Sequence, residues 1–122
     1  MCKILLSINP EHVENILSGT KKYEFRKVQC KETVDKIVIY STYPVMKVVG
    51  EVDVLDILVN SPDVVWNETS KYAGITKRFF DKYYNRRDKA VAYHLGNVRK
   101  FKIPKNLSDY GLKSAPQSFV YI

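Results

Sequence analysis

The sequence has few of the residues that stabilise small extracellular domains or bind metals. Its 122 residues include two cysteines, Cys2 and Cys30, which are too few for a disulfide framework. Neither belongs to a CxxC pair, and the histidines His12 and His94 stand far apart without a supporting zinc motif. We therefore expect reduced thiols and no structural metal.

Long apolar runs and nucleotide-binding motifs are missing too. No stretch approaches the roughly 18 apolar residues that span a bilayer, and the first apolar run is too short for a signal peptide. These absences favour a cytoplasmic protein without a membrane partner. No GxGxxG, P-loop or nucleophile-elbow motif is present, which argues against dinucleotide and NTP enzymes, and we expect no cofactor.

What the chain has in excess is positive charge. Lys and Arg number 20 against 13 Asp and Glu, which gives a formal net charge of +7. Such an excess attracts polyanions over long distances and favours RNA, a nucleotide or a modified nucleoside as partner. A solvated basic surface that only keeps the protein soluble explains the same composition. An anionic membrane is less favoured, because no basic amphipathic helix with bulky apolar anchors stands out.

The pattern along the chain predicts one domain over residues 1–122. Hydrophobic residues make up 45% of the chain and charged residues 27%, which is ordinary for a globular protein and argues against general disorder. No linker, repeat or change of composition divides the chain. The sequence leaves the oligomeric state open.

The first helix has clear start and stop signals. Asn9-Pro10-Glu11 supplies an N-cap, a proline at the first helical position and an acidic residue near the positive end of the helix dipole. Val13, Ile16 and Leu17 follow at helical spacing, and Gly19 ends the helix.

Short strands surround further helices in the rest of the chain. A helical stretch is expected from residue 61 to 72 and a shorter helix after Thr76. Gly96-Asn97 predicts a tight hairpin between two strands. The strands are expected at residues 3–8, 22–27, 34–41, 47–59, 89–95, 98–103 and 118–122. This order predicts an α+β fold whose sheet curls into a small open barrel.

The segment from Gly19 to Arg26 offers the most chemistry. Because side chains alternate along a strand, Glu24 and Arg26 are expected on one face, together with Lys22, while Tyr23 and Phe25 lie on the other. Lys21 then enters from the turn, and two cations around one carboxylate can orient a phosphate or a polar base edge. A solvated strand face with a weak Glu–Arg pair fits the same spacing.

This segment also carries a family resemblance. The pattern Gly-x-Lys-x-x-Glu-x-Arg, read here as Gly19, Lys21, Glu24 and Arg26, resembles the signature of ASCH domains, which belong to the PUA-like group. The strand and helix before it resemble the family as well, as do residues 40–42, 48–52 and 116–119. The resemblance covers most of the chain and implies a curled, mostly antiparallel sheet that forms a PUA-like open β-barrel with helices at its margins. It also implies a cleft for RNA or a modified nucleoside.

The resemblance implies a set of cleft residues around the signature. The implied ligand-binding residues are Ser7, Asn9, Lys21, Glu24, Arg26, Tyr40, Ser41, Thr42, Gln117 and Ser118. Several have ordinary structural explanations too, since Asn9 can simply cap its helix and Ser41-Thr42 can shape the turn before Pro44.

One branch of the ASCH family hydrolyses the amide of N4-acetylcytidine with a Thr, a Lys and a Glu as proposed catalytic group. This sequence keeps Lys21 but has Glu24 where the Thr would stand. Tyr72-Ala73-Gly74 falls near the place of that branch's Glu. Both departures count against this activity here.

Three functions follow in order of preference. The first is an RNA- or nucleotide-binding domain with a basic cleft. The second is a hydrolase acting on RNA or a modified nucleoside, with Glu24 as general base and Lys21 and Arg26 stabilising charge. The third is a protein-interaction domain that uses the aromatic residues between 79 and 84, although core packing is the more common role for aromatics at helical spacing.

Overall fold

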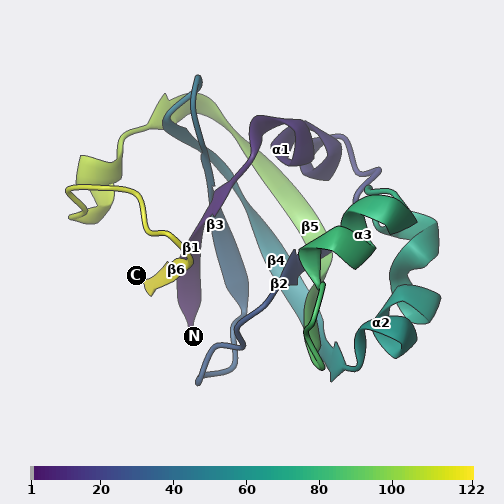
Figure 1. Cartoon of the computed structure of the whole chain (residues 1–122). Helices are drawn as coiled ribbons and strands as arrows, with labels where there is room; N and C mark the ends of the chain where they lie inside the picture. The colour runs from purple at the N-terminus through teal and green to yellow at the C-terminus, as the bar shows by residue number, and fades with distance from the viewer. Residues whose placement is uncertain (1) are drawn as a thin grey trace.

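The computed structural model describes residues 2–122 and is built around one six-stranded sheet (Figure 1). The strands are β1 (Lys3–Ile8), β2 (Tyr23–Arg26), β3 (Lys36–Ser41), β4 (Lys47–Asn60), β5 (Ala90–Lys105) and β6 (Phe119–Tyr121). The helices are α1 (Pro10–Leu17), α2 (Pro62–Thr69) and α3 (Lys77–Tyr83), with short 3-10 turns η1 (Ser70–Tyr72) and η2 (Leu107–Tyr110). None of the helices in the described part of the chain is long and apolar enough to cross a membrane.

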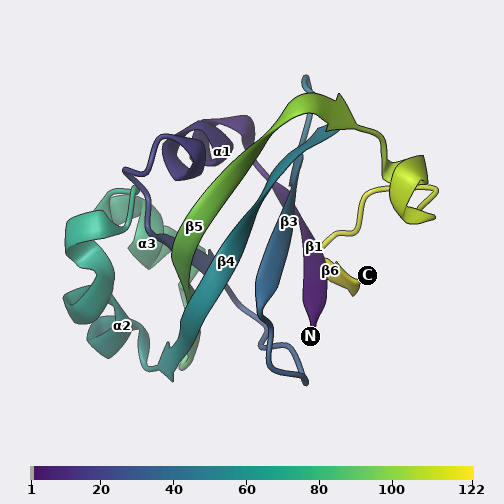
Figure 2. The ribbon, with the colours of Figure 1, turned by 180° about the vertical axis from the view of Figure 1, so that it is seen from behind.

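The sheet is mixed but mostly antiparallel. Its strand order is β2-β5-β4-β3-β1-β6, and the β1–β3 pair alone is parallel among the described strands. The long strands β4 and β5 run diagonally across the molecule and curl the sheet into a half-barrel (Figure 2). Helices α1, α2 and α3 lie at one side of it, and η2 lies at the other (Figure 1). The predicted α+β fold with a curled sheet and marginal helices is confirmed.

Helix α1 begins and ends where the sequence predicted. The side chain of Asn9 accepts a hydrogen bond from the Glu11 N–H, and Pro10 occupies the first helical position. Val13 and Ile16 are buried, and Gly19 adopts φ +85°, a conformation that glycine reaches without the strain a Cβ brings. The helix therefore leads the chain back toward the sheet just before the 19–26 segment.

The predicted hairpin at Gly96-Asn97 is wrong. Residues 90–105 form one strand, β5, and the Gly-Asn pair lies inside it. Val52 pairs with Val98 and Val54 with Leu95, so β5 has one residue more than β4 between these pairs. The pair therefore forms a β-bulge, which bends the strand and adds twist instead of reversing the chain.

Strand β4 confirms the strand expected at residues 47–59. It is a single bent strand with irregular pairing near Gly50. A Cβ at Gly50 would lie 2.6 Å from the Arg99 carbonyl oxygen, so glycine permits the close approach of β5.

The helical stretch after β4 runs to Tyr72, as the sequence predicted. Helix α2 ends at Thr69, the 3-10 helix η1 continues it to Tyr72, and Gly74 follows with φ +70°. This turn passes directly over Lys21, because a Cβ at Gly74 would lie 2.6 Å from the Lys21 side chain. The turn between η1 and α3 thus helps to build the site described next.

Candidate functional site

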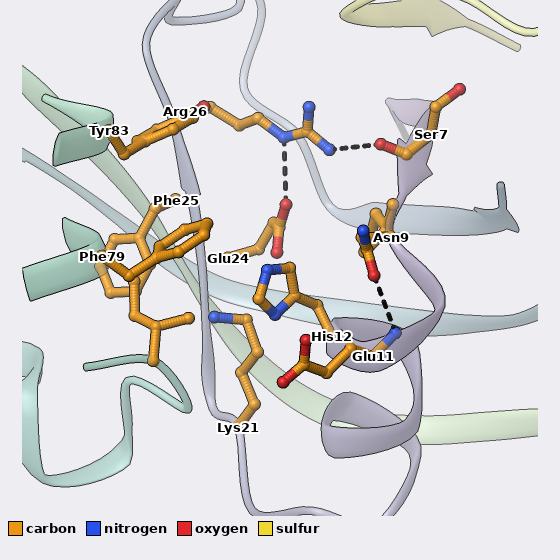
Figure 3. A pocket seen from close by; sticks show the side chains of 12 residues that line it. Ser7, Asn9, Glu11, His12, Lys21, Glu24, Phe25, Arg26, Phe79 and Tyr83 are labelled. Carbon is orange, nitrogen blue, oxygen red and sulfur yellow. Dashed lines mark hydrogen bonds and ion pairs between the residues drawn. The ribbon is translucent and has the colours of Figure 1, made fainter.

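A cavity of about 270 Å³ lies where the end of β1, the start of α1, strand β2 and helix α3 meet (Figure 3). It is lined by Ser7, Ile8, Asn9, Glu11, His12, Lys21, Glu24, Phe25, Arg26, Ile75, Phe79 and Tyr83. Three cationic or titratable basic side chains and two carboxylates face this space together with aromatic rings. Among residues 2–122, no group of three or more His, Cys, Asp and Glu side chains is arranged to hold a metal ion.

Strand β2 brings Glu24 and Arg26 together as its alternation predicted. Arg26 Nε lies 3.1 Å from Glu24 Oε2, and the two side chains are only 15% and 9% exposed. Arg26 Nη2 also donates to the Ser7 carbonyl oxygen at 2.9 Å. The pair is therefore a sheltered one, and removing one partner of such a pair costs about 3–5 kcal/mol because the other charge stays buried. A guanidinium has five N–H donors, so Arg26 keeps donors for a ligand.

Lys22 does not share the face of Glu24 and Arg26. Strand β2 begins one residue later, at Tyr23, so strand alternation does not reach Lys22. Its exposed Nζ lies 4.9 Å from the Tyr72 ring centroid. Lys22 thus belongs to the outer surface and not to the cavity.

Lys21 is the most deeply buried cation of the site. The residue is 3% exposed, and its Nζ donates to the Ala73 carbonyl oxygen at 2.6 Å and lies 4.9 Å from the Phe25 ring centroid. Burial lowers the pKa of the Lys21 ammonium, and the nearby Glu24 carboxylate partly offsets this. The 72–74 segment therefore offers Lys21 a backbone carbonyl.

The aromatic residues of α3 divide between the core and the cavity. Phe80 and Tyr84 are 1% and 3% exposed and pack with Phe25 in one core cluster. Phe79 and Tyr83 line the cavity instead, and Phe79 is 47% exposed. The expectation of core packing thus holds for half of the stripe, while the other half provides a surface on which a base can stack.

Sequence reasoning missed His12 and Glu11. Both lie in the first turn of α1 and line the cavity. The two histidines lack a metal spacing, yet His12 follows three residues after the cap Asn9 on the helix that precedes the signature. That proximity is the signal that could have identified it.

Five of the implied ligand-binding residues lie outside this cavity. They are Tyr40, Ser41, Thr42, Gln117 and Ser118. Tyr40 is 5% exposed in a core cluster on the other side of the sheet, and Ser41 is 2% exposed at the end of β3.

In the tail, Pro116 contacts β1, whereas the predicted residues Gln117 and Ser118 are exposed. Ser7 Oγ donates to the Pro116 carbonyl oxygen at 2.8 Å. The structure therefore gathers Ser7, Asn9, Lys21, Glu24 and Arg26 around one cavity. Gln117 and Ser118 lie just before β6, the strand that pairs with β1.

Comparison with known proteins agrees with this architecture. The family model of the ASCH domain matches residues 6–105. A crystal structure of ASCH from Zymomonas mobilis superposes with a TM-score of 0.89 and 26% identity, covering 98% of this chain and 87% of that one. An ASCH domain-containing ribonuclease from the same species is 28% identical over 104 residues, which are 84% of this chain and 70% of that protein.

Two further relatives are much longer proteins from Ureaplasma parvum. Part of an ATP synthase subunit alpha is 35% identical over 98% of this chain, and part of a large ribosomal subunit protein uL22 is 31% identical over 98%. The chain spans 15% of the first protein and 39% of the second. The likeness thus concerns one region of each.

Proposed function

This chain belongs to the ASCH domain family, and we propose that it binds single-stranded RNA in the cavity between β2, α1 and α3 and cleaves it there. The observation that carries the proposal is the Glu24–Arg26–Lys21 group, in which a carboxylate and two cations are held together at a cavity wall. A modified nucleoside is the alternative ligand, because it presents the same base and ribose.

The binding part rests on charge and on aromatic surface. Arg26 is oriented by Glu24 and by the Ser7 carbonyl, so that its remaining donors can meet a phosphate or a base edge. Phe79 and Tyr83 add aromatic rings to the cavity lining, and a base stacks on such a ring irrespective of sequence. The net charge of +7 attracts the rest of the strand.

The size of the cavity limits what enters it. Small-molecule sites commonly measure about 300–1,000 Å³, and this cavity of about 270 Å³ lies just below that range. One nucleotide unit can therefore occupy the cavity while the flanking nucleotides remain on the surface. Binding of this kind suits an unpaired strand, whose bases can turn away from their neighbours.

The cleavage part rests on Glu24. Its carboxylate lies within a sheltered space beside Lys21 and Arg26, which are suited to stabilise negative charge developing on a phosphate. A carboxylate in that position can remove a proton from a ribose hydroxyl. A 28% identical relative that bears the name ribonuclease supports the same reaction class.

Binding is tested by fluorescence anisotropy of a labelled single-stranded RNA, with a matched DNA, at about 50 and 200 mM salt. We expect Arg26→Lys to weaken RNA binding by about tenfold or more, because the single ammonium loses the forked contacts of the guanidinium. The control is Lys102→Ala on the exposed part of β5, which removes one charge outside the cavity lining. Equal weakening by both variants would mean that the cavity is not the binding site.

Cleavage is tested with the same RNA analysed on a denaturing gel. Glu24→Gln keeps the shape of the side chain but removes the base, so we expect cleavage to fall by about 100-fold or more while RNA binding persists. Cleavage at the parent rate in this variant excludes Glu24 as the base. Absence of both binding and cleavage in the parent would leave a modified nucleoside as ligand, or a protein-interaction domain, as the remaining functions.

A further inference from the structure

His12 lies at the centre of the cavity, yet the proposed function does not employ it (Figure 3). It stands in the first turn of α1, where the Asn9 cap and Pro10 hold the backbone and where Val13 and Ile16 anchor the other face of the helix in the core. A rigid helix therefore fixes the position of the imidazole before a substrate binds.

One ring nitrogen of His12 makes no hydrogen bond within the described residues. This atom, Nδ1, is shielded from solvent. The ring meets the Phe79 ring edge to face, with centroids 5.5 Å apart and an interplanar angle of 74°. Sheltered polar atoms almost always have a partner, so this one calls for a functional explanation.

The groups around His12 bear both signs of charge. They are Lys21, Glu24 and Arg26 from the signature segment, Glu11 from α1 itself and the phenol of Tyr83 from α3. Burial and the Lys21 ammonium lower the pKa of His12 below its ordinary 6.5, against the carboxylates of Glu24 and Glu11, which raise it. Protonated His12 therefore gives up its proton more readily than an ordinary histidine, and it lies in the same cavity as the proposed base Glu24.

We propose that His12 is the general acid of the cavity and donates its proton to the oxygen that leaves when RNA is cleaved. This inference rests on the proposed cleavage and adds a residue to it. The pairing follows from the arrangement, because Glu24 and His12 line the same cavity from β2 and α1 (Figure 3).

The proton balance of the step is complete without a further reactant. Glu24 accepts the proton of the ribose 2′-hydroxyl as its oxygen bonds to phosphorus, and the bond from phosphorus to the 5′-oxygen breaks. His12 gives one proton to that 5′-oxygen, so the products are a 2′,3′-cyclic phosphate and a free 5′-hydroxyl. Arg26 and Lys21 stabilise the extra charge on the phosphorane oxygens. The reverse proton transfers, with water in place of the 5′-hydroxyl, open the cyclic phosphate and restore both groups.

The pH dependence follows from the same assignment. The acid form of His12 must be present, and its pKa in the free protein lies below 6.5. The alkaline fall of kcat/KM is therefore expected below pH 6.5, while a bound phosphate raises the pKa of His12 and moves the fall of kcat to higher pH.

The decisive experiment compares two substrates that differ in their leaving group. One is a uridine-containing dinucleotide with an ordinary 5′-oxygen, and the other is uridine 3′-(4-nitrophenyl phosphate), whose leaving group departs without a proton. We expect His12→Ala to cleave the dinucleotide about 100-fold or more slowly than the parent but to cleave the nitrophenyl ester within a few fold of it. Glu24→Gln should be slow on both.

The control is His94→Gln on β5, whose imidazole lies 3.4 Å from Asp56 and does not line the cavity. It should leave both rates unchanged. Equal loss on both substrates in His12→Ala, or no loss on the dinucleotide, overturns the assignment while leaving the proposed cleavage standing. If the parent cleaves neither substrate, the proposed cleavage fails and the role of His12 fails with it.

Discussion

At the scale of single residues, Lys21 is the clearest case of a charged side chain that the fold buries away from water. Its ammonium is nearly excluded from solvent and has one backbone carbonyl within hydrogen-bond distance. Burial lowers its pKa, so the folded protein holds this proton less firmly than the unfolded chain does. Such a group can shed its proton near a substrate more readily than a surface lysine.

The first prediction concerns how stability varies with pH. Between the lowered pKa of Lys21 and its ordinary 10.5, the unfolded chain binds more protons than the folded one, so the free energy of unfolding gains from rising pH. Lys21→Met removes this contribution. We expect the difference in unfolding free energy between the variant and the parent to shift in favour of the parent as pH rises from 7 toward 10.5. Urea unfolding at several pH values measures this difference, and a constant value contradicts the prediction.

Gly74 supports the second prediction, because it is both strained for other residues and close to Lys21. It adopts φ +70°, and a Cβ there would lie 2.6 Å from Lys21 Cβ and Cγ. Gly111 adopts φ +74° with nothing within 4 Å. Both alanine variants lose about 1–2 kcal/mol to backbone strain, and Gly74→Ala should lose further stability and weaken RNA binding. Thermal melts and the anisotropy titration test the pair, and equal losses would show that Lys21 is not crowded.

At the scale of elements, strands β4 and β5 show how glycine controls sheet curvature. Both strands carry irregular pairing, and their glycines lie where the partner strand comes close. A Cβ at Gly50 would meet the Arg99 carbonyl oxygen at 2.6 Å, whereas a Cβ at Gly96 would meet the end of the exposed Leu55 side chain at 2.8 Å. Backbone cannot move aside as a surface side chain can.

The third prediction follows from that contrast. Gly50→Ala should cost about 1–3 kcal/mol, which is typical of overpacking against a rigid neighbour. Gly96→Ala should cost less, because Leu55 can turn toward solvent. Chemical unfolding of both variants gives the two free energies. If Gly96→Ala costs the larger amount, the bulge in β5 and not the approach at Gly50 limits the curl of the sheet.

At the scale of the whole molecule, the last strand pairs with the first and forms one edge of the sheet. Strand β6 pairs with β1 through Leu5 and Val120, and Pro116 accepts the hydrogen bond of Ser7 at the cavity end of β1. Residues more than 100 positions apart therefore hold the strand that leads into α1. The tail supports the site without lining it.

The fourth prediction tests this support. A chain ending at residue 113 lacks β6 and uncovers the edge of β1. We expect it to lose about 2–4 kcal/mol of stability, because the apolar contacts of Phe119 and Val120 are gone, and to self-associate through the free edge. A full-length chain with residues 113–115 replaced by glycine serves as control. Thermal melts and size-exclusion chromatography compare the two, and equal stability would show that β6 contributes little.

The sequence by itself determined the local features whose causes lie within a few residues. The Asn9-Pro10 start of α1, its end at Gly19 and the meeting of Glu24 with Arg26 all follow from caps, φ preference and strand alternation. The order of short strands and helices predicted the curled sheet, and the family signature implied the same architecture. Chain-local physics thus predicted the signature strand and the helix before it.

Only the tertiary structure decided which distant side chains meet. It made Gly96-Asn97 a bulge, because pairing along the whole of β4 outweighs the local turn preference of two residues. It placed Phe79 beside His12 and sheltered Lys21 beneath the 72–74 turn, since both contacts join segments more than 50 residues apart. Composition and spacing carry no record of such contacts, because they arise when the sheet curls and brings α1 and α3 to the same side.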